Sequence, residues 1–120
     1  MDSQTGSNWF GLDGKLALVT GASSGLGARF ATVLAEQGCK LVIAARRMDR
    51  LEALRDRLEA KGARVYCVCM DVSSVDSIEA GVAQAQALAG PIDILVNNSG
   101  VSTTQRLSDV TEKDFDFVFN

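Results

Sequence analysis

The stretch from Lys15 to Gln37, KLALVTGASSGLGARFATVLAEQ, joins an apolar run to an amphipathic run through a glycine-rich turn. Residues 15–20 suit a strand that is buried on both faces. Residues 25–37 predict a helix, because large apolar side chains recur there at helical spacing. These side chains are Leu26, Phe30, Val33 and Leu34. The sequence therefore predicts a strand that turns directly into a helix.

Such a turn creates a binding site for phosphate. The first backbone N–H groups of the helix have no partner inside it, and the helix dipole adds partial positive charge. Gly21 lets the chain leave the strand, Gly25 has no side chain to hold a pyrophosphate away, and Gly27 lets the helix lie close to the strand. Ser23 and Ser24 can add hydroxyl donors. The alternative is a purely structural turn, but the strand before it and the helix after it favour a nucleotide site.

Composition narrows the function classes. The 120 residues are 47% hydrophobic, which suits one globular domain with one core. A net charge of −3 argues against binding of nucleic acid by charge alone. No apolar run is long enough to cross a membrane, and residues 1–8 lack the apolar segment of a signal peptide. We therefore expect a cytoplasmic protein with no nucleic-acid or membrane partner.

The three cysteines, Cys39, Cys67 and Cys69, lie in or beside apolar strand-like runs. We interpret them as small buried hydrophobic residues in a reducing compartment. The chain has no histidine that could complete a metal site with them, so we expect no metal.

The rest of the chain alternates strands with helices after a loose lead-in over residues 1–13. Further strands are predicted over 40–45, 64–70 and 92–96, and helices over 49–61, 74–89 and from Thr111 to the unfinished end at Asn120. This alternation predicts the α/β class, with a doubly wound, Rossmann-like parallel sheet in the order 3-2-1-4. The ligand of such a sheet lies at the carboxyl ends, where strands one and four part.

Two arginines follow the second strand. A dinucleotide site often has an acidic residue there to bind ribose hydroxyls. This chain instead has Ala45, then Arg46 and Arg47. Guanidinium groups suit the 2′-phosphate of NADP, which a carboxylate would repel. The alternative is a solvated basic start to the next helix, but positive charge there opposes the helix dipole.

Asp71 and Val72 follow the third strand. The Asp71 carboxylate could accept from an adenine amino group while the Val72 backbone pairs with the ring. An ordinary aspartate that ends a strand before a serine-capped helix is an equal alternative.

Asn97, Asn98, Ser99 and Gly100 end the fourth strand. Such residues can hydrogen-bond across neighbouring strand ends and let the backbone approach a ribose. A simple polar turn is again an equal alternative when this cluster is taken alone.

Together these places resemble the short-chain dehydrogenases/reductases. The loop from Thr20 to Gly27, which includes Leu26, is similar to the family's Thr-Gly-x-x-x-Gly-x-Gly, and Asp71-Val72 resembles its adenine contact. The Asn-Asn-Ser-Gly cluster is similar to its Asn-Asn-Ala-Gly, with Ser99 in place of Ala. The resemblance runs from Phe10 onward. It implies hydride transfer between a nicotinamide cofactor and a small carbonyl or alcohol substrate, and a homo-oligomer, dimer or tetramer; Arg46 and Arg47 make NADP the expected cofactor.

The family's catalytic residues are absent from this chain. They are an Asn, a Ser and a Tyr-x-x-x-Lys pair, and by the resemblance they lie after residue 120. The only tyrosine, Tyr66, has Met70 four residues on, and Asn120 falls two positions short of the family's Asn. We therefore expect residues 14–120 to be the N-terminal, NADP-binding part of a single Rossmann domain, incomplete at its C-terminal end and inactive alone. The alternative is a nucleotide-binding or interaction module that never catalyses.

The same reasoning predicts an open sheet edge. The family's sheet continues beyond the fourth strand, so the strand over 92–96 would lie unpaired at the edge of this chain. We expect the isolated chain to aggregate or to fold only partly.

Overall fold

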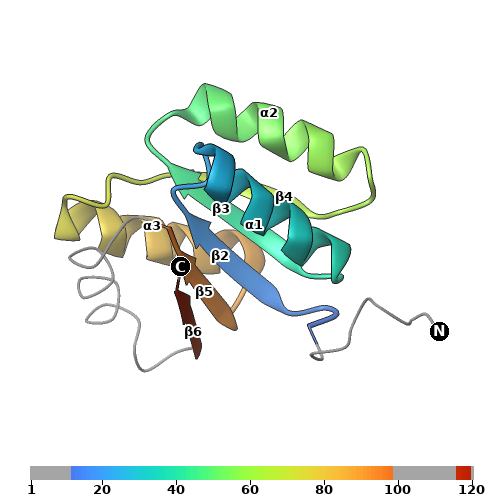
Figure 1. Cartoon of the computed structure of the whole chain (residues 1–120). Coiled ribbons are helices and arrows are strands. Elements are labelled where there is room, and N and C mark those ends of the chain that lie inside the picture. Colours follow the sequence, from blue (N-terminus) through green and yellow to red (C-terminus); the bar gives the residue numbers. More distant parts are fainter. Residues whose placement is uncertain (1–11, 99–115, 120) are drawn as a thin grey trace.

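The computed structural model describes residues 12–98 and 116–119. In these residues one parallel sheet of five strands, ordered β4-β3-β2-β5-β6, carries helices on both faces (Figure 1). The strands are β2 (Leu16–Thr20), β3 (Lys40–Ala45), β4 (Val65–Cys69), β5 (Ile94–Asn97) and β6 (Asp116–Phe119). The helices are α1 (Gly25–Glu36), α2 (Met48–Glu59) and α3 (Val75–Ala89). The predicted doubly wound sheet and its order over the first four strands are confirmed.

The sheet separates two apolar clusters. Side chains of β2 alternate between them: Ala17 and Val19 face α1 and α2, whereas Leu16 and Leu18 face α3. All five residues of β2 are buried. An apolar run without polar alternation is what a central strand covered on both faces requires.

Helix α1 packs through its small residues. Gly27 and Ala31 are its buried positions, while Leu26 and Val33 are 49% and 53% exposed. The helix predicted from this spacing is present, but these two of its large apolar side chains do not lie on its buried face. Leu88 near the end of α3, which helical spacing predicted to face inward, is 46% exposed, so that prediction was wrong. A helix that must lie close to a sheet places its smallest side chains at the contact, which turns larger neighbours outward.

The C-terminal segment differs from its prediction. Residues 116–119 form strand β6, which pairs parallel with β5 from Ile94↔Asp116 to Asn97↔Phe119. The predicted helix is therefore wrong over these residues, and its start at Thr111 lies outside the described residues. Alternating aromatic and β-branched residues favour a strand, and the open edge of β5 supplies the backbone groups to pair with. Strand β5 is consequently not the sheet edge.

A glycine in the left-handed conformation follows each of the first two helices, at the position where helices commonly end. Gly38 follows α1 with a φ of +89°, and Gly62 follows α2 with a φ of +98°. Over the described residues, no helix combines the length and the apolar character needed to cross a membrane.

Candidate functional site

The glycine loop connects the carboxyl end of β2 to the first turn of α1. Gly21 has a φ of +68°, so the chain leaves the strand in the left-handed region. A Cβ at Gly27 would collide with the Gly21 carbonyl oxygen and lie 2.8 Å from its carbon. A Cβ at Gly25 would meet nothing within 4 Å. Gly21 and Gly27 therefore shape the turn, whereas Gly25 opens a space in front of it.

Ser24 holds the loop together. It is the N-cap of α1, where its hydroxyl accepts from the Gly27 N–H at 3.1 Å and from Asn98 Nδ2 at 2.9 Å. The same hydroxyl donates to the Gly21 carbonyl at 2.9 Å. A serine has one proton to donate, so Ser24 has none left for a phosphate in this arrangement. Half-buried Ser23 is the remaining hydroxyl candidate.

A buried polar pair joins the ends of β2 and β5. Thr20 Oγ1 donates to Asn97 Oδ1 at 2.8 Å, and the Asn98 backbone N–H donates to Thr20 Oγ1 at 3.4 Å. These contacts confirm that the asparagines bond across neighbouring strand ends. Our sequence reasoning gave Thr20 no role of this kind, although a polar residue that ends an apolar strand was the available signal. Ser99 and Gly100 lie outside the described residues.

The two arginines after β3 have different environments. Arg47 precedes α2 and forms an ion pair with Asp49 at 3.3 Å, which holds the pKa of that carboxyl below its usual value. Arg46 is also exposed, but it makes no ion pair or side-chain hydrogen bond within residues 12–98. The structural alternative therefore accounts for Arg47, and Arg46 is the guanidinium left open at this edge.

Asp71 forms a tight turn before α3. Its Oδ1 accepts from the Ser73 hydroxyl at 2.6 Å and from the Ser73 N–H at 3.0 Å. These bonds are the main cause that lowers the pKa of Asp71, with a smaller contribution from the charge of Arg46. Asp71 is thus ionised at neutral pH, and Val72 beside it is half-buried against the α3-side cluster. Ser74 caps α3 as the strand-end alternative expects, and the carboxylate still has acceptor capacity for a ligand, so both interpretations of Asp71 stay open.

Strand register brings these places to one edge. Thr20 pairs with Ala44 on one side and with Asn97 on the other, and Ala45 pairs with Cys69. The glycine loop, Arg46, Asp71 and Asn98 all follow the carboxyl ends of these strands. Open backbone at the start of α1 suits a pyrophosphate, and an unpaired guanidinium suits one more phosphate. The described residues hold no cluster of three or more side chains able to bind a metal.

Comparison with known proteins identifies the family. The model of the short chain dehydrogenase family matches residues 15–120, so this chain belongs to that family. The oxidoreductase UcpA of Salmonella typhimurium is 43% identical over 106 residues, which cover 88% of this chain and 40% of UcpA. The chain spans less than half the length of the curated relatives it matches.

Solved structures show the same fold. L-sorbose reductase of Gluconobacter frateurii, solved with NADPH and L-sorbose, matches with a TM-score of 0.75 and 32% identity over 81% of this chain and 46% of its own. A family member from Burkholderia phymatum, solved with NAD, matches with a TM-score of 0.81 and 30% identity over 87% of this chain and 45% of its own. Members of similar fold thus bind either nicotinamide cofactor.

Proposed function

We propose that this chain binds NADP(H) at the carboxyl edge of its sheet. The observation that carries the proposal is the state of Arg46, an exposed guanidinium without an ion pair among the described residues. It follows β3, where an NAD site would place a carboxylate. Since Arg47 already pairs with Asp49, Arg46 is the residue available for a 2′-phosphate.

Under this proposal the remaining residues bind different parts of the cofactor. The open backbone from Gly25 through Leu26 to Gly27 receives the pyrophosphate, with Ser23 as a hydroxyl donor. Asp71 and Val72 hold the adenine.

The residues at the end of β5 contact the ribose side of the cofactor. Asn98 fixes the loop through Ser24 and borders the ribose, together with Ser99 and Gly100 that follow it in sequence. The bound cofactor supplies hydride chemistry, and these residues bind and orient it.

For the whole protein we propose hydride transfer between the nicotinamide and a small carbonyl or alcohol substrate. This rests on the family, whose members here include a gluconate dehydrogenase and a sorbose reductase. The catalytic Tyr-x-x-x-Lys would then lie C-terminal to Asn120 in a longer protein, and this chain alone would be inactive. We also propose a cytoplasmic homo-oligomer without a nucleic-acid or membrane partner.

Competition with adenosine fragments tests the cofactor assignment. Adenosine 2′,5′-bisphosphate carries the phosphate that Arg46 should bind, whereas adenosine 5′-monophosphate lacks it. We expect the bisphosphate to displace bound NADPH at a concentration at least tenfold lower than the monophosphate. Equal displacement by the two nucleotides would refute NADP selectivity while leaving a nucleotide site in place.

The second candidate is a nucleotide-binding module without catalysis. The chain's only tyrosine, Tyr66, has methionine rather than lysine four residues on, so residues 1–120 hold no Tyr-x-x-x-Lys pair under either candidate. The gene sequence after the codon for Asn120 separates the two candidates. A serine followed by Tyr-x-x-x-Lys supports the enzyme, and a stop codon supports the module.

A further inference from the structure

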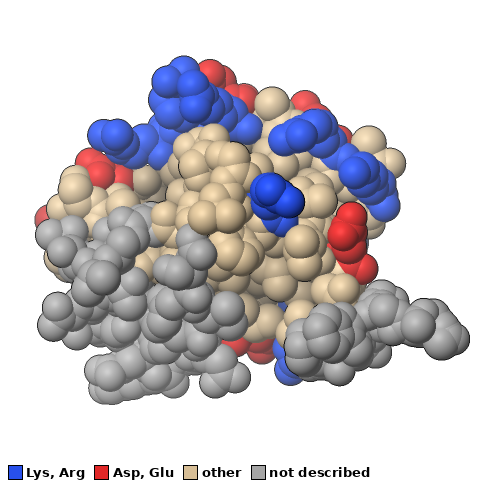
Figure 2. All heavy atoms as spheres, viewed as in Figure 1, with Lys and Arg blue, Asp and Glu red and all other residues tan. Residues whose placement is uncertain are grey.

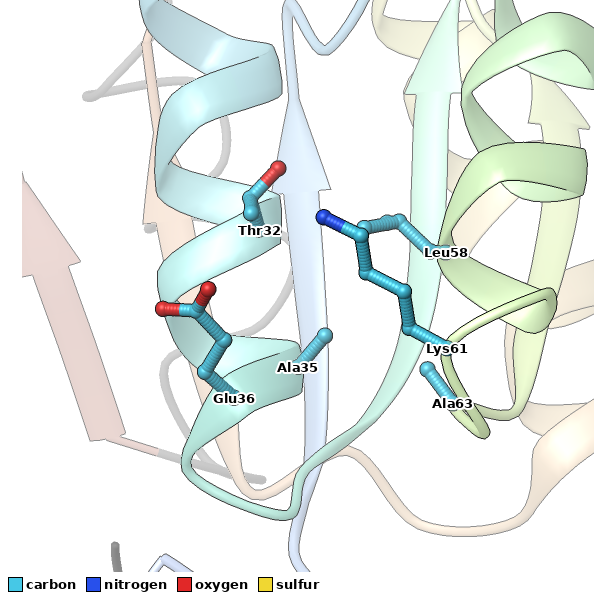
Figure 3. Close-up of a pocket in the computed structure, with 6 residues that line it drawn as sticks. All are labelled: Thr32, Ala35, Glu36, Leu58, Lys61 and Ala63. Atoms are coloured by element: carbon cyan, nitrogen blue, oxygen red, sulfur yellow. The ribbon is translucent and has the colours of Figure 1, made fainter. Parts of the chain in front are cut away.

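A groove runs between α1 and α2 on the outer side of the molecule. Its upper part, a hollow of about 370 Å³, is lined by Gly25, Ala28, Arg29, Thr32, Val33 and Arg57. Its lower part shares Thr32 and continues along Ala35, Glu36, Leu58, Lys61 and Ala63 (Figure 3). The floor is thus made mostly of small and apolar side chains, and cations stand along the rim.

The rim cations lack acidic partners. Arg29 of α1 and Arg57 of α2 are exposed and make no ion pair or side-chain hydrogen bond in the part of the chain that the structure describes. Two other arginines of this region are paired: Arg47 with Asp49, and Arg55 with Asp56 and Glu59. Pairing is therefore available in and beside α2, yet the two arginines that line the groove lack it, as do Arg46, Arg50 and Arg64 elsewhere in the described part of the chain.

A third cation extends the row. Figure 3 shows the Lys61 side chain reaching toward Thr32, while the Glu36 carboxylate points away from the Lys61 ammonium group. Figure 2 shows Lys and Arg gathered over α2 and reaching α1 on this face. The chain as a whole carries a net charge of −3. The groove lining itself holds three cations, Arg29, Arg57 and Lys61, and one acidic residue, Glu36, and such a local excess of positive charge attracts negative charge.

We propose that this groove docks an acidic, amphipathic helical segment of a partner protein. Each wall is a 12-residue helix, about 18 Å long at 1.5 Å per residue, which matches roughly three turns of a docked helix. Apolar side chains of the segment lie against half-buried Ala28 and Ala35 and half-exposed Val33. Carboxylates on its flanks pair with Arg29 and Arg57. Helix-in-groove recognition uses this combination of an apolar face and charged edges.

Other anions fit the groove less well. A nucleic-acid backbone would place phosphates against an apolar floor, and it would gain few cations from an acidic protein. A small free anion would leave the exposed Val33 side chain in contact with water. It would also pair with only one of the two guanidinium groups. An amphipathic acidic segment can place apolar side chains on the floor of the groove and carboxylates beside the cations of the rim.

Fluorescence anisotropy with synthetic peptides tests the proposal on the full-length protein. The probe is a 15-residue helical peptide with leucines on one face and glutamates on its flanks. The controls are the same peptide with lysine for glutamate, a scrambled peptide of equal composition, and inorganic polyphosphate. We expect the probe to bind at least tenfold more tightly than every control, with an affinity that falls as salt rises.

Charge reversal locates the site. R29E/R57E should weaken binding of the probe at least tenfold and should bind the lysine peptide in its place. R55E is the control for charge reversal as such, because it reverses the charge of one paired arginine outside the groove, and it should bind the probe as wild type does. R29Q/R57Q repeats the test without reversed charge if the first variant does not fold. All variants should keep the wild-type affinity for NADPH.

Several outcomes would overturn the proposal. They are equal binding of the scrambled peptide or of polyphosphate, an equal loss in R55E, and no loss in either groove variant. Failure of the wild type to bind NADPH would count against the cofactor assignment alone, because the peptide is bound by Arg29 and Arg57, which are not part of the proposed cofactor site; the two sites meet only at Gly25.

Discussion

Thr20 and Asn97 join the carboxyl ends of β2 and β5 by a side-chain hydrogen bond of 2.8 Å in the interior of the protein. Their exposed fractions are 0% and 1%, and they are the buried polar residues of the described core. The glycine loop starts at the next residue after Thr20, and Asn98 reaches that loop through Ser24. The pair thus sets how the loop and the end of β5 lie relative to each other.

Thr20→Val should remove this bond with little change of shape. Loss of one partner of a buried hydrogen bond costs about 1–3 kcal/mol. We expect the free energy of unfolding to fall by about that amount and NADPH binding to weaken, because the loop loses its anchor. Thr20→Ser keeps the hydroxyl and is the control. Chemical denaturation of the three proteins measures the effect, and equal stability of wild type and Thr20→Val would contradict the anchoring role.

The glycines at positions 25 and 27 should respond differently to alanine. Gly27→Ala forces a methyl group against the Gly21 carbonyl, and overpacking of this kind costs about 1–3 kcal/mol. Gly25→Ala meets open space and should leave the melting temperature unchanged while it weakens NADPH binding. Gly25→Val should abolish binding, since its side chain occupies the place of the pyrophosphate, yet the protein should still fold. Wild-type NADPH affinity in Gly25→Val would show that the phosphate site lies elsewhere.

The cysteines should react with thiol reagents in a fixed order. Cys69 is exposed, Cys67 is half-buried and Cys39 is buried. Burial raises the pKa of Cys39 and of Cys67, so at pH 8 less of each is the reactive thiolate. We expect Cys69 to be labelled first and Cys39 last, as measured by mass spectrometry of digested protein. Fast labelling of Cys39 in the folded protein would contradict its placement behind Leu12.

Much of the fold follows from local chemistry. The order of the first four strands and the glycines that end α1 and α2 were predictable, because the spacing of apolar residues and the choice of turn residues are features of short stretches of sequence. The buried face of α1 was not, since helical spacing alone cannot tell whether Gly27 and Ala31 or Leu26 and Val33 face the sheet. Strand β6 was not predictable either. It forms by pairing with the edge of β5, which is not its neighbour in the sequence.

The candidate site was predicted in outline and not in detail. Motif spacing indicated the loop, the arginines and the asparagines. The sequence does not reveal that the Ser24 hydroxyl donates its proton to the Gly21 carbonyl or that Arg47 pairs with Asp49, because both contacts depend on side-chain directions. The difference between Arg46 and Arg47 therefore emerged only from the structure.

The isolated chain provides a separate test. We predicted aggregation or partial folding because β5 would be an open edge. In the structure β6 pairs with β5, so the open edge is β6 instead. Strand β6 has no second neighbour among the described strands. The expected result is unchanged, since an open edge still offers unpaired backbone groups. Size-exclusion chromatography with circular dichroism decides it, and a soluble monomer that melts cooperatively would favour the stand-alone module.

The affinity of Arg46→Ala for NADPH tests the central claim most directly. A hydrogen bond to a charged group contributes about 1.5–3 kcal/mol, which corresponds to a roughly tenfold to hundredfold rise in Kd. Isothermal titration of the intact protein should show this loss for NADPH and almost none for NADH. Arg47→Ala, the matched control, should change NADPH binding less, because Asp49 already holds its guanidinium. Equal losses of NADPH and NADH affinity in Arg46→Ala would contradict the assignment of this residue to the 2′-phosphate.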